Sequence, residues 1–389
     1  MLDYIFSVLI LFSGFIFIRY NKKKFNVSNY RTLNKLWIYH IIFILLFYIY
    51  TQNNSADANG YWRIAKNSSE TLFYKFLSMG PGTNFIYVIN YFPAKILDLS
   101  IFTGMLFYGL LGFLGFYFFY YITIQLIPHN YKLNKINLFP ALFFLPNLHF
   151  WTAGVGKDSL MFFCIGLFSF SMLKISKRMH LIFLSLFLIY MVRPHVLIML
   201  LFAFSLAFLF SKKISKPKKI FFSSLLIGVV IVITPLVLKY LNLDYVSTIS
   251  DVIVRTETQA SNLSGKSIGS SIDISSYPYP LKVFSFLFRP LFFYLDGLFS
   301  LVSSFENLLL LILTIKIVNK GIIKSIRKSP LVIKGLAFFL ISGTLIFSLS
   351  LSNLGIILRM KNMFLPGFLI LILWSLSYQR TIKSNKTNK

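Results

Sequence analysis

The chain has 389 residues, of which 57% are hydrophobic and only 13% are charged, about half the charged fraction of a typical soluble protein. Its 39 basic and 11 acidic residues give a net charge of +28. A nucleic-acid binder of this charge would be polar, a disordered basic chain would lack the 45 Phe and 22 Tyr residues, and one cysteine excludes a disulfide scaffold. The composition predicts an all-α polytopic integral membrane protein without a nucleic-acid partner.

Apolar runs recur along the chain, and a helix needs roughly 20 such residues to cross a bilayer. In chain order, the long candidates are 2–18, 36–50, 101–127, 220–238, 296–318, 331–351 and 362–378. Prolines and polar breaks divide the middle of the chain into shorter runs, which we interpret as two hairpins of short helices: 136–150, 159–173, 181–192 and 196–210. The sequence therefore predicts about eleven transmembrane helices, some short or broken, in a single transmembrane domain covering 1–389.

The distribution of charge predicts the orientation of these helices. If the N-terminus lies outside, 26 of the 39 basic residues and no acidic residue fall in the inside segments, as the positive-inside rule requires. The basic tail, 379–389, is then cytoplasmic. We expect the first span to be an anchor rather than a signal peptide, since its basic cluster at 22–24 follows the apolar run. The two longest polar stretches become a first outer loop, 51–84, and a large outer loop, 239–280.

The first outer loop contains Asp57, followed by Tyr61, Trp62 and Arg63. An acid at a membrane edge can act as a general base or bind Mg²⁺ or Mn²⁺, with Arg63 as a supporting cation. The alternative is a solvated loop whose aromatic residues lie in the interfacial belt. No zinc site is expected, because the spacing of the histidines and the cysteine matches no zinc motif.

The tips of the two short hairpins carry further candidates. Lys157 and Asp158 follow a glycine-containing turn in 150–159, where Lys157 and backbone N–H groups can bind a phosphate and Asp158 is a second candidate base. A capped tight turn is the alternative interpretation. Arg193 and His195 flank a proline at the other tip. The Arg193 guanidinium suits phosphate oxygens, although snorkelling to the interface would also explain it.

Three more charged residues occur near the last spans. Arg289 precedes a proline as Arg193 does, Glu306 lies ten residues into an apolar helix, and Arg359 precedes the final span. A carboxylate as deep as Glu306 should face the helix bundle and pair with a cation. The predicted orientation brings the candidate phosphate-binding residues to the outer face, where they would form a pocket for a phosphate or diphosphate at headgroup level. These residues are Lys157, Arg193, His195, Arg289 and Arg359.

Asp57 in the first outer loop, the outer set of Lys and Arg, and the short broken helices together resemble polytopic lipid-linked glycosyltransferases of the GT-C type. Bacterial envelope-polysaccharide proteins, including O-antigen and capsule polymerases, are similar in five short stretches: 150–159, 193–195, 288–290, 306–307 and 355–366. The resemblance implies that Asp57 is a base or metal ligand and that the outer arginines bind a diphosphate.

The sequence therefore predicts a glycosyltransferase or polysaccharide polymerase that uses a polyprenyl-phosphate- or diphosphate-linked sugar. It would act at the outer face of the plasma membrane in envelope polysaccharide biosynthesis, with envelope-biosynthesis proteins as possible partners. The abundance of Phe, Ile, Lys, Asn and Tyr indicates a low-GC bacterium. Two alternatives are a flippase for lipid-linked oligosaccharide, which would need a charged path through the membrane, and a non-catalytic subunit of an envelope-assembly complex.

Overall fold

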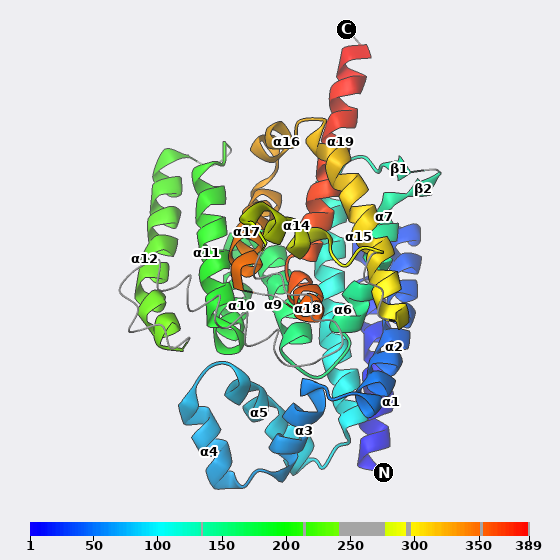
Figure 1. The fold of residues 1–389 in the computed structure, drawn as a ribbon, viewed down its shortest axis with the longest axis vertical. Coiled ribbons are helices and arrows are strands. Elements are labelled where there is room, and N and C mark those ends of the chain that lie inside the picture. The colour runs from blue at the N-terminus through cyan, green and yellow to red at the C-terminus, as the bar shows by residue number, and fades with distance from the viewer. Residues whose placement is uncertain (134, 213–214, 241–276, 293–296, 351–352, 388–389) are drawn as a thin grey trace. The chain divides into compact units, whose positions relative to one another are not determined.

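The computed structural model divides the chain into two compact units, each almost wholly helical (Figure 1). The first unit comprises Met1–Ile124 and Phe139–Pro194, and the second comprises Gln125–Leu138 and His195–Lys389. The predicted large outer loop, 239–280, lies mostly outside the described residues. The structure describes residues 1–133, 135–212, 215–240, 277–292, 297–350 and 353–387.

The first unit begins with two long helices and ends with a helical hairpin. Its elements are α1 (Leu2–Tyr20), the 3-10 turn η1 (Lys22–Lys24), α2 (Val27–Asn53), α3 (Asp57–Asn67), α4 (Glu70–Met79), α5 (Thr83–Tyr91), the π-helical turn η2 (Phe92–Ile96), most of α6 (Ile101–Leu126), most of α7 (Leu138–Ala141), the 3-10 turn η3 (Leu142–Phe144), α8 (Pro146–Trp151), α9 (Lys157–Ser171), the 3-10 turn η4 (Met172–Lys177) and α10 (Met179–Val192).

The second unit starts with a small antiparallel hairpin and continues with helices. Its elements are β1 (Lys132–Leu133), β2 (Ile136–Asn137), α11 (Pro194–Leu209), α12 (Lys216–Tyr240), α14 (Tyr279–Phe288), α15 (Gly297–Val318), α16 (Ile322–Lys328), α17 (Leu331–Ser350), α18 (Leu354–Lys361) and α19 (Leu365–Thr387).

Among the described residues, six helices are long and apolar enough to cross a membrane: α1, α2, α6, α9 extended by η4, α15 and α17. The bent pair α18 and α19, with 62° between its parts, makes a seventh if it is one span. This confirms an all-α, multi-pass membrane protein. The expected count of about eleven spans is not supported, because α10, α11, α14 and the apolar part of α12 are shorter than a full crossing.

Residues 136–150 do not form the short spanning helix that the sequence predicts. The segment contains part of the β-hairpin, the four-residue α7, a 3-10 turn and the six-residue α8. Phe139 has an extended backbone (φ −100°, ψ 126°) that interrupts the helical path. Pro140 and Pro146 explain the breaks, because proline cannot donate a helical hydrogen bond and restricts the residue before it.

The first unit has an acidic end and a basic end. At the acidic end Asp3, near the start of α1, accepts hydrogen bonds from the Ser100 backbone (2.8 Å) and the Thr103 hydroxyl (2.6 Å). Helices α3, α4 and α5 lie at this end, where the N-terminus also lies (Figure 1). At the basic end, burial and the nearby Arg178 charge lower the pKa of Lys24. The acidic end also carries Arg63 and Lys66 on α3 and Lys75 on α4, and Lys66 pairs with Asp98 at 2.8 Å, so this end mixes both signs of charge. The described charged residues of η1 and η4 at the other end are all basic.

A buried histidine pair joins the helices of the first unit. The Nδ1 atoms of His40 on α2 and His149 on α8 are 2.9 Å apart. The other ring nitrogen of His40 is 3.0 Å from the Gly109 carbonyl, and that of His149 is 2.8 Å from the Phe143 carbonyl. All four ring nitrogens therefore have polar neighbours, and these contacts join α2, α6 and α8 in the core.

The second unit gathers its basic segments at one end. Lys316 on α15 lies over the ring of Tyr131, and Arg380 on α19 donates to the carbonyl of Asn130. Lys334, near the start of α17, donates to the carbonyl of Phe210, just past α11. We call this the basic end of the second unit. The described residues of the segments 128–135, 211–219, 316–334 and 379–387 thus lie at one end of the unit although they are far apart in sequence.

Candidate functional site

The first outer loop of the sequence prediction folds into helices, and α3 begins at Asp57. The carboxylate lies exposed at this helix N-terminus, where the dipole favours a negative charge. Tyr61 and Trp62 are buried, and the Trp62 Nε1 donates to the Leu99 carbonyl at 3.3 Å. Gly104 makes room for this indole, since a Cβ there would overlap the Trp62 ring. This packing holds α3 against α6 and positions Asp57.

Asp57 lies close enough to Tyr87 on α5 to act on it electrostatically. Partial burial and the Asp57 charge both raise the pKa of the Tyr87 hydroxyl. Tyr61 packs edge-on against the same tyrosine, with the ring centroids 6.1 Å apart. The acid that the sequence places in an outer loop therefore lies near an aromatic pair from α3 and α5.

The glycine-containing turn before α9 also lies against Tyr61. Gly156, the residue before α9, has φ +148°, and a Cβ there would lie 3.3 Å from the Tyr61 ring. The next residue, Lys157, donates from Nζ to the Thr83 hydroxyl at 2.8 Å. Thr83 is the first residue of α5. The Lys157 ammonium is therefore held near two helix N-termini, where backbone N–H groups add positive potential.

Asp158 and Arg193 form a buried ion pair between the two tips of the sequence prediction. The Arg193 Nη2 lies 2.7 Å from the Asp158 Oδ1, and the residues are 6% and 9% exposed. Asp158 is in the first turn of α9, and Arg193 directly follows α10. The guanidinium is therefore fixed in orientation, and the carboxylate is engaged in holding it.

A backbone hydrogen bond also links the start of α5 to α10. The Gly82 N–H, before the start of α5, donates to the Met191 carbonyl on α10 at 2.8 Å. It ties α5, and with it Thr83, to the end of α10 that carries Arg193. We call Asp57, Thr83, Lys157, Asp158 and Arg193 the charged cluster. It combines two cations, helix N-termini and an exposed acid, which is the chemistry required to bind an anion and to accept a proton nearby.

Arg63 stays outside this cluster. Its side chain is exposed on α3, and no contact among the described residues brings it to the cluster. The supporting role that the sequence predicts for Arg63 stays a prediction.

The other predicted phosphate-binding residues belong to the second unit. Arg289, after α14, donates to the Tyr277 hydroxyl at 3.3 Å and lies over its ring. His195 packs edge-on against Phe347, with the ring centroids 6.0 Å apart. Arg359 is half-buried on α18. The expectation that these residues share one pocket with Lys157 and Arg193 concerns two units and stays a prediction.

Sequence reasoning missed the cation that belongs with Glu306. Lys361, the last residue of α18, is 1% exposed and interacts electrostatically with Glu306, which is 6% exposed. Its Nζ donates to the Asn307 side chain and to the Leu287 carbonyl, and Asn307 donates to the Pro290 carbonyl. The signal was present, because a buried carboxylate in an apolar helix needs a cation, but the position of Lys361 just before the last span is also typical of a water-facing edge.

Within the described ranges, no three His, Cys, Asp or Glu side chains meet as metal ligands. A Mg²⁺ or Mn²⁺ ion at Asp57 would therefore need ligands from substrate or water in addition to this carboxylate. No protein-family model, curated protein or solved structure matches the chain. The charged cluster is thus the principal basis for assigning a function.

Proposed function

We propose that this protein is a membrane glycosyltransferase or polysaccharide polymerase that uses a polyprenyl-phosphate- or diphosphate-linked sugar donor. The supporting observation is the charged cluster, in which Lys157 and the paired Arg193 lie at the acidic end of the first unit, together with Asp57. A donor of this kind presents its phosphate at headgroup level, where its lipid can remain in the membrane. The cluster combines phosphate-binding cations with an exposed carboxylate at one end of membrane-spanning helices.

Each residue has a separate role in the proposal. Lys157 and Arg193 bind the phosphate and stabilise the charge that develops on it as the sugar leaves, which is the largest contribution in many enzymes. Asp57 takes the proton from the acceptor hydroxyl. Asp158 positions Arg193, because an acid already bound to a guanidinium is a poorer base than the exposed Asp57. In the second unit, His195, Arg289 and Arg359 keep the phosphate-binding role that the sequence predicts for them.

The proposed function includes the orientation predicted from the sequence. With the N-terminus outside and the C-terminal tail in the cytoplasm, the acidic end of the first unit faces outward. No described acidic residue lies in η1, in η4 or at the basic end of the second unit, and this supports the orientation through the positive-inside rule. Eleven crossings result if the bent pair α18 and α19, the shorter apolar helices α10, α11 and α12, and the broken segment 136–150 all cross the bilayer. The membrane is proposed to be the bacterial plasma membrane.

The test compares variants in cells that lack their own copy of the gene. The Asp57→Asn variant should reduce polymer on gels by roughly 10²–10⁴-fold, with protein levels unchanged on immunoblots. Arg193→Lys keeps the charge but loses the guanidinium fork, and should also lose product. Normal product from both variants would overturn the proposed roles.

Glu70 provides a matched control for Asp57. It is also an exposed acid in the first turn of a short helix of the first unit, so Glu70→Gln removes an equal charge from the same end. This variant should make wild-type product. An equal loss in Glu70→Gln and Asp57→Asn would mean that the overall negative charge, rather than a base, is required.

A second experiment separates the proposed enzyme from the two other classes of protein. The purified chain in vesicles is given the lipid-linked saccharide that accumulates in the deletion cells. An enzyme lengthens or transfers this saccharide without any other protein. A flippase would move it across the vesicle wall unchanged, and a non-catalytic subunit would do neither, so both outcomes contradict the proposal.

A further inference from the structure

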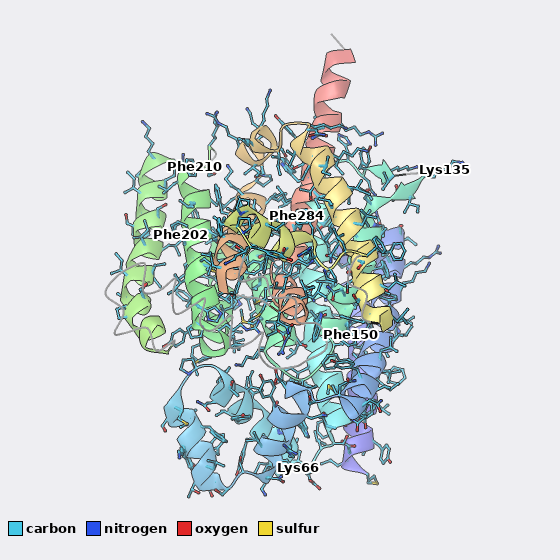
Figure 2. The ribbon with its side chains drawn as sticks, viewed as in Figure 1. Lys66, Lys135, Phe150, Phe202, Phe210 and Phe284 are labelled. Atoms are coloured by element: carbon cyan, nitrogen blue, oxygen red, sulfur yellow. The ribbon has the colours of Figure 1, made fainter. Side chains whose placement is uncertain are left out.

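The basic end of the second unit contains an apolar groove of about 630 Å³, between the ends of α11 and α12 and helices α16 and α17. Its walls include Phe210, Ile326, Phe338 and Ile341. Figure 2 labels Phe210 at the end of α11, with Phe202 farther back along the same helix. The groove therefore lies at the level where these apolar helices end.

Four cationic residues also line the groove: Lys212, Lys219, Arg327 and Lys334. Lys334 is 2% exposed, and its ammonium donates to the carbonyls of Phe210 (3.0 Å) and Arg327 (3.4 Å). The charges of Lys219 and Lys212 act on it electrostatically. Like charges this close repel one another, so an anion between them would stabilise the arrangement.

Among the described residues, no acidic side chain lines the groove. The one described carboxylate of the second unit is Glu306, which lies with Lys361. Glu306 is also ten residues before Lys316 on α15, about 15 Å along the helix from the basic end. The charge of the groove is therefore positive throughout its described lining.

We propose that this groove binds an anionic phospholipid of the adjacent membrane leaflet. One acyl chain lies along Phe210, Phe338 and Ile341, and the headgroup phosphate lies between Lys212, Lys219 and Arg327. The apolar walls of the groove match the acyl chain of a lipid, and the cations match its headgroup phosphate. A soluble anion would leave the apolar walls exposed to water. The buried Lys334 forms the base of the site.

The experiment uses the purified full-length protein in neutral detergent. Dioleoylphosphatidylglycerol is titrated against dioleoylphosphatidylcholine, and native mass spectrometry counts the lipid that stays bound. We expect the anionic lipid to bind preferentially to wild-type protein. The double variant Lys212→Gln/Lys219→Gln should bind it roughly tenfold or more weakly, because each lysine near a membrane contributes about fivefold.

Lys320 and Lys324 provide the matched control. Both are exposed cations in the same basic segment but lie outside the groove lining. Lys320→Gln/Lys324→Gln should therefore retain wild-type binding, although it removes the same charge. An equal loss in the two double variants would overturn the site, because the attraction would then come from net charge alone.

Two further measurements test the apolar part of the site. Ile323, which lines the groove and is 80% exposed, can be changed to Ser without disturbing the core, and this variant should weaken lipid binding. Glycerol phosphate, the headgroup without acyl chains, should compete poorly. Competition by glycerol phosphate as effective as that of the lipid would overturn the proposal in favour of a soluble phosphate site.

Discussion

Arg193 and Asp158 form a buried ion pair 2.7 Å long, with the two partners 35 residues apart in sequence. The pair joins the end of α10 to the start of α9. It therefore does two things at once: it closes a helical hairpin, and it fixes the guanidinium that we propose to bind phosphate. These two effects can be separated, because one concerns stability and the other concerns product.

Removing one partner of this ion pair should lower the free energy of unfolding more than removing both partners. Asp158→Asn leaves the Arg193 guanidinium buried without its carboxylate partner, and we expect a loss of about 3–5 kcal/mol in the free energy of unfolding. Asp158→Asn/Arg193→Gln removes both charges and should cost less than the sum of the single changes. Unfolding in mixed micelles, followed by tryptophan fluorescence, gives these values. Strictly additive losses would show that the two residues are not coupled.

The proximity of Asp57 to Tyr87 predicts a titration shift. Burial and the Asp57 charge raise the pKa of Tyr87, so Asp57→Asn should move that pKa back toward its ordinary value. The Glu70→Gln control should leave it unchanged. Fluorotyrosine placed at position 87 and followed by ¹⁹F NMR from neutral to alkaline pH measures this directly. An unshifted titration in Asp57→Asn would place the acid away from the aromatic pair.

The same shift has a consequence for stability. A tyrosine whose pKa is raised in the folded state keeps its proton at pH values where the unfolded chain has lost it. Its effect on the free energy of unfolding therefore begins above the ordinary tyrosine pKa of about 10. Below that pH the group contributes no pH dependence. Between the unfolded and folded pKa values, stability should fall as pH rises, and Asp57→Asn should weaken this fall. Melting temperatures of the two proteins across alkaline pH test the sign.

Gly112 on α6 is expected to tolerate no side chain. A Cβ at this position would overlap the Thr152 carbonyl oxygen, which is backbone and cannot rotate away. Gly112→Ala should therefore lower stability by about 1–3 kcal/mol, as overpacking usually does, and displace the turn before Lys157. Gly60 on α3 has open space around it, so Gly60→Ala should be neutral or slightly stabilising. Equal melting temperatures for the two variants would contradict this packing.

The buried network around Lys361 gives another test. Lys361→Met removes the cation that interacts with Glu306 and should cost about 3–5 kcal/mol. Adding Glu306→Gln should restore part of that loss, because the remaining buried charge is neutralised. Lys320 is an exposed lysine in the same unit, and Lys320→Met should change stability by less than about 0.5 kcal/mol. A loss in Lys361→Met no larger than this would mean that Lys361 is not buried with Glu306.

Local composition was enough to predict most of the membrane helices. The runs 2–18, 101–127 and 331–351 correspond to α1, α6 and α17. Each is a continuous apolar segment, and such segments must be helical in lipid to satisfy their backbone groups.

Segments stabilised by tertiary packing could not be predicted in the same way. The stretch 51–84 has a polar composition typical of a loop, yet α3 forms because Trp62 and its neighbours bury one face against α6. Conversely, 136–150 is apolar enough for a helix but is broken at Phe139 and at its prolines. Hydrophobicity alone does not distinguish these cases, because the deciding contacts come from distant parts of the chain.

For the candidate site, the sequence identified individual residues but not which of them contact one another. Asp158 and Arg193 stood out because each lies at a break between apolar runs. Their pairing depends on how α9 packs against α10, and the closeness of Asp57 to Tyr87 depends on α3 packing near α5. Lys361 was missed because its neighbour Arg359 suggested a water-facing position for the whole segment.

The segment Gln125–Leu138 belongs to the second unit, although it is followed by a return to the first. Its His129 backbone N–H bonds to the Ser377 hydroxyl, 248 residues later. At a synthesis rate of about 5–20 residues per second, the segment waits roughly 12–50 s for this partner. During biogenesis, the second unit therefore begins with a short piece that must stay available at the membrane surface until the last helix emerges from the ribosome.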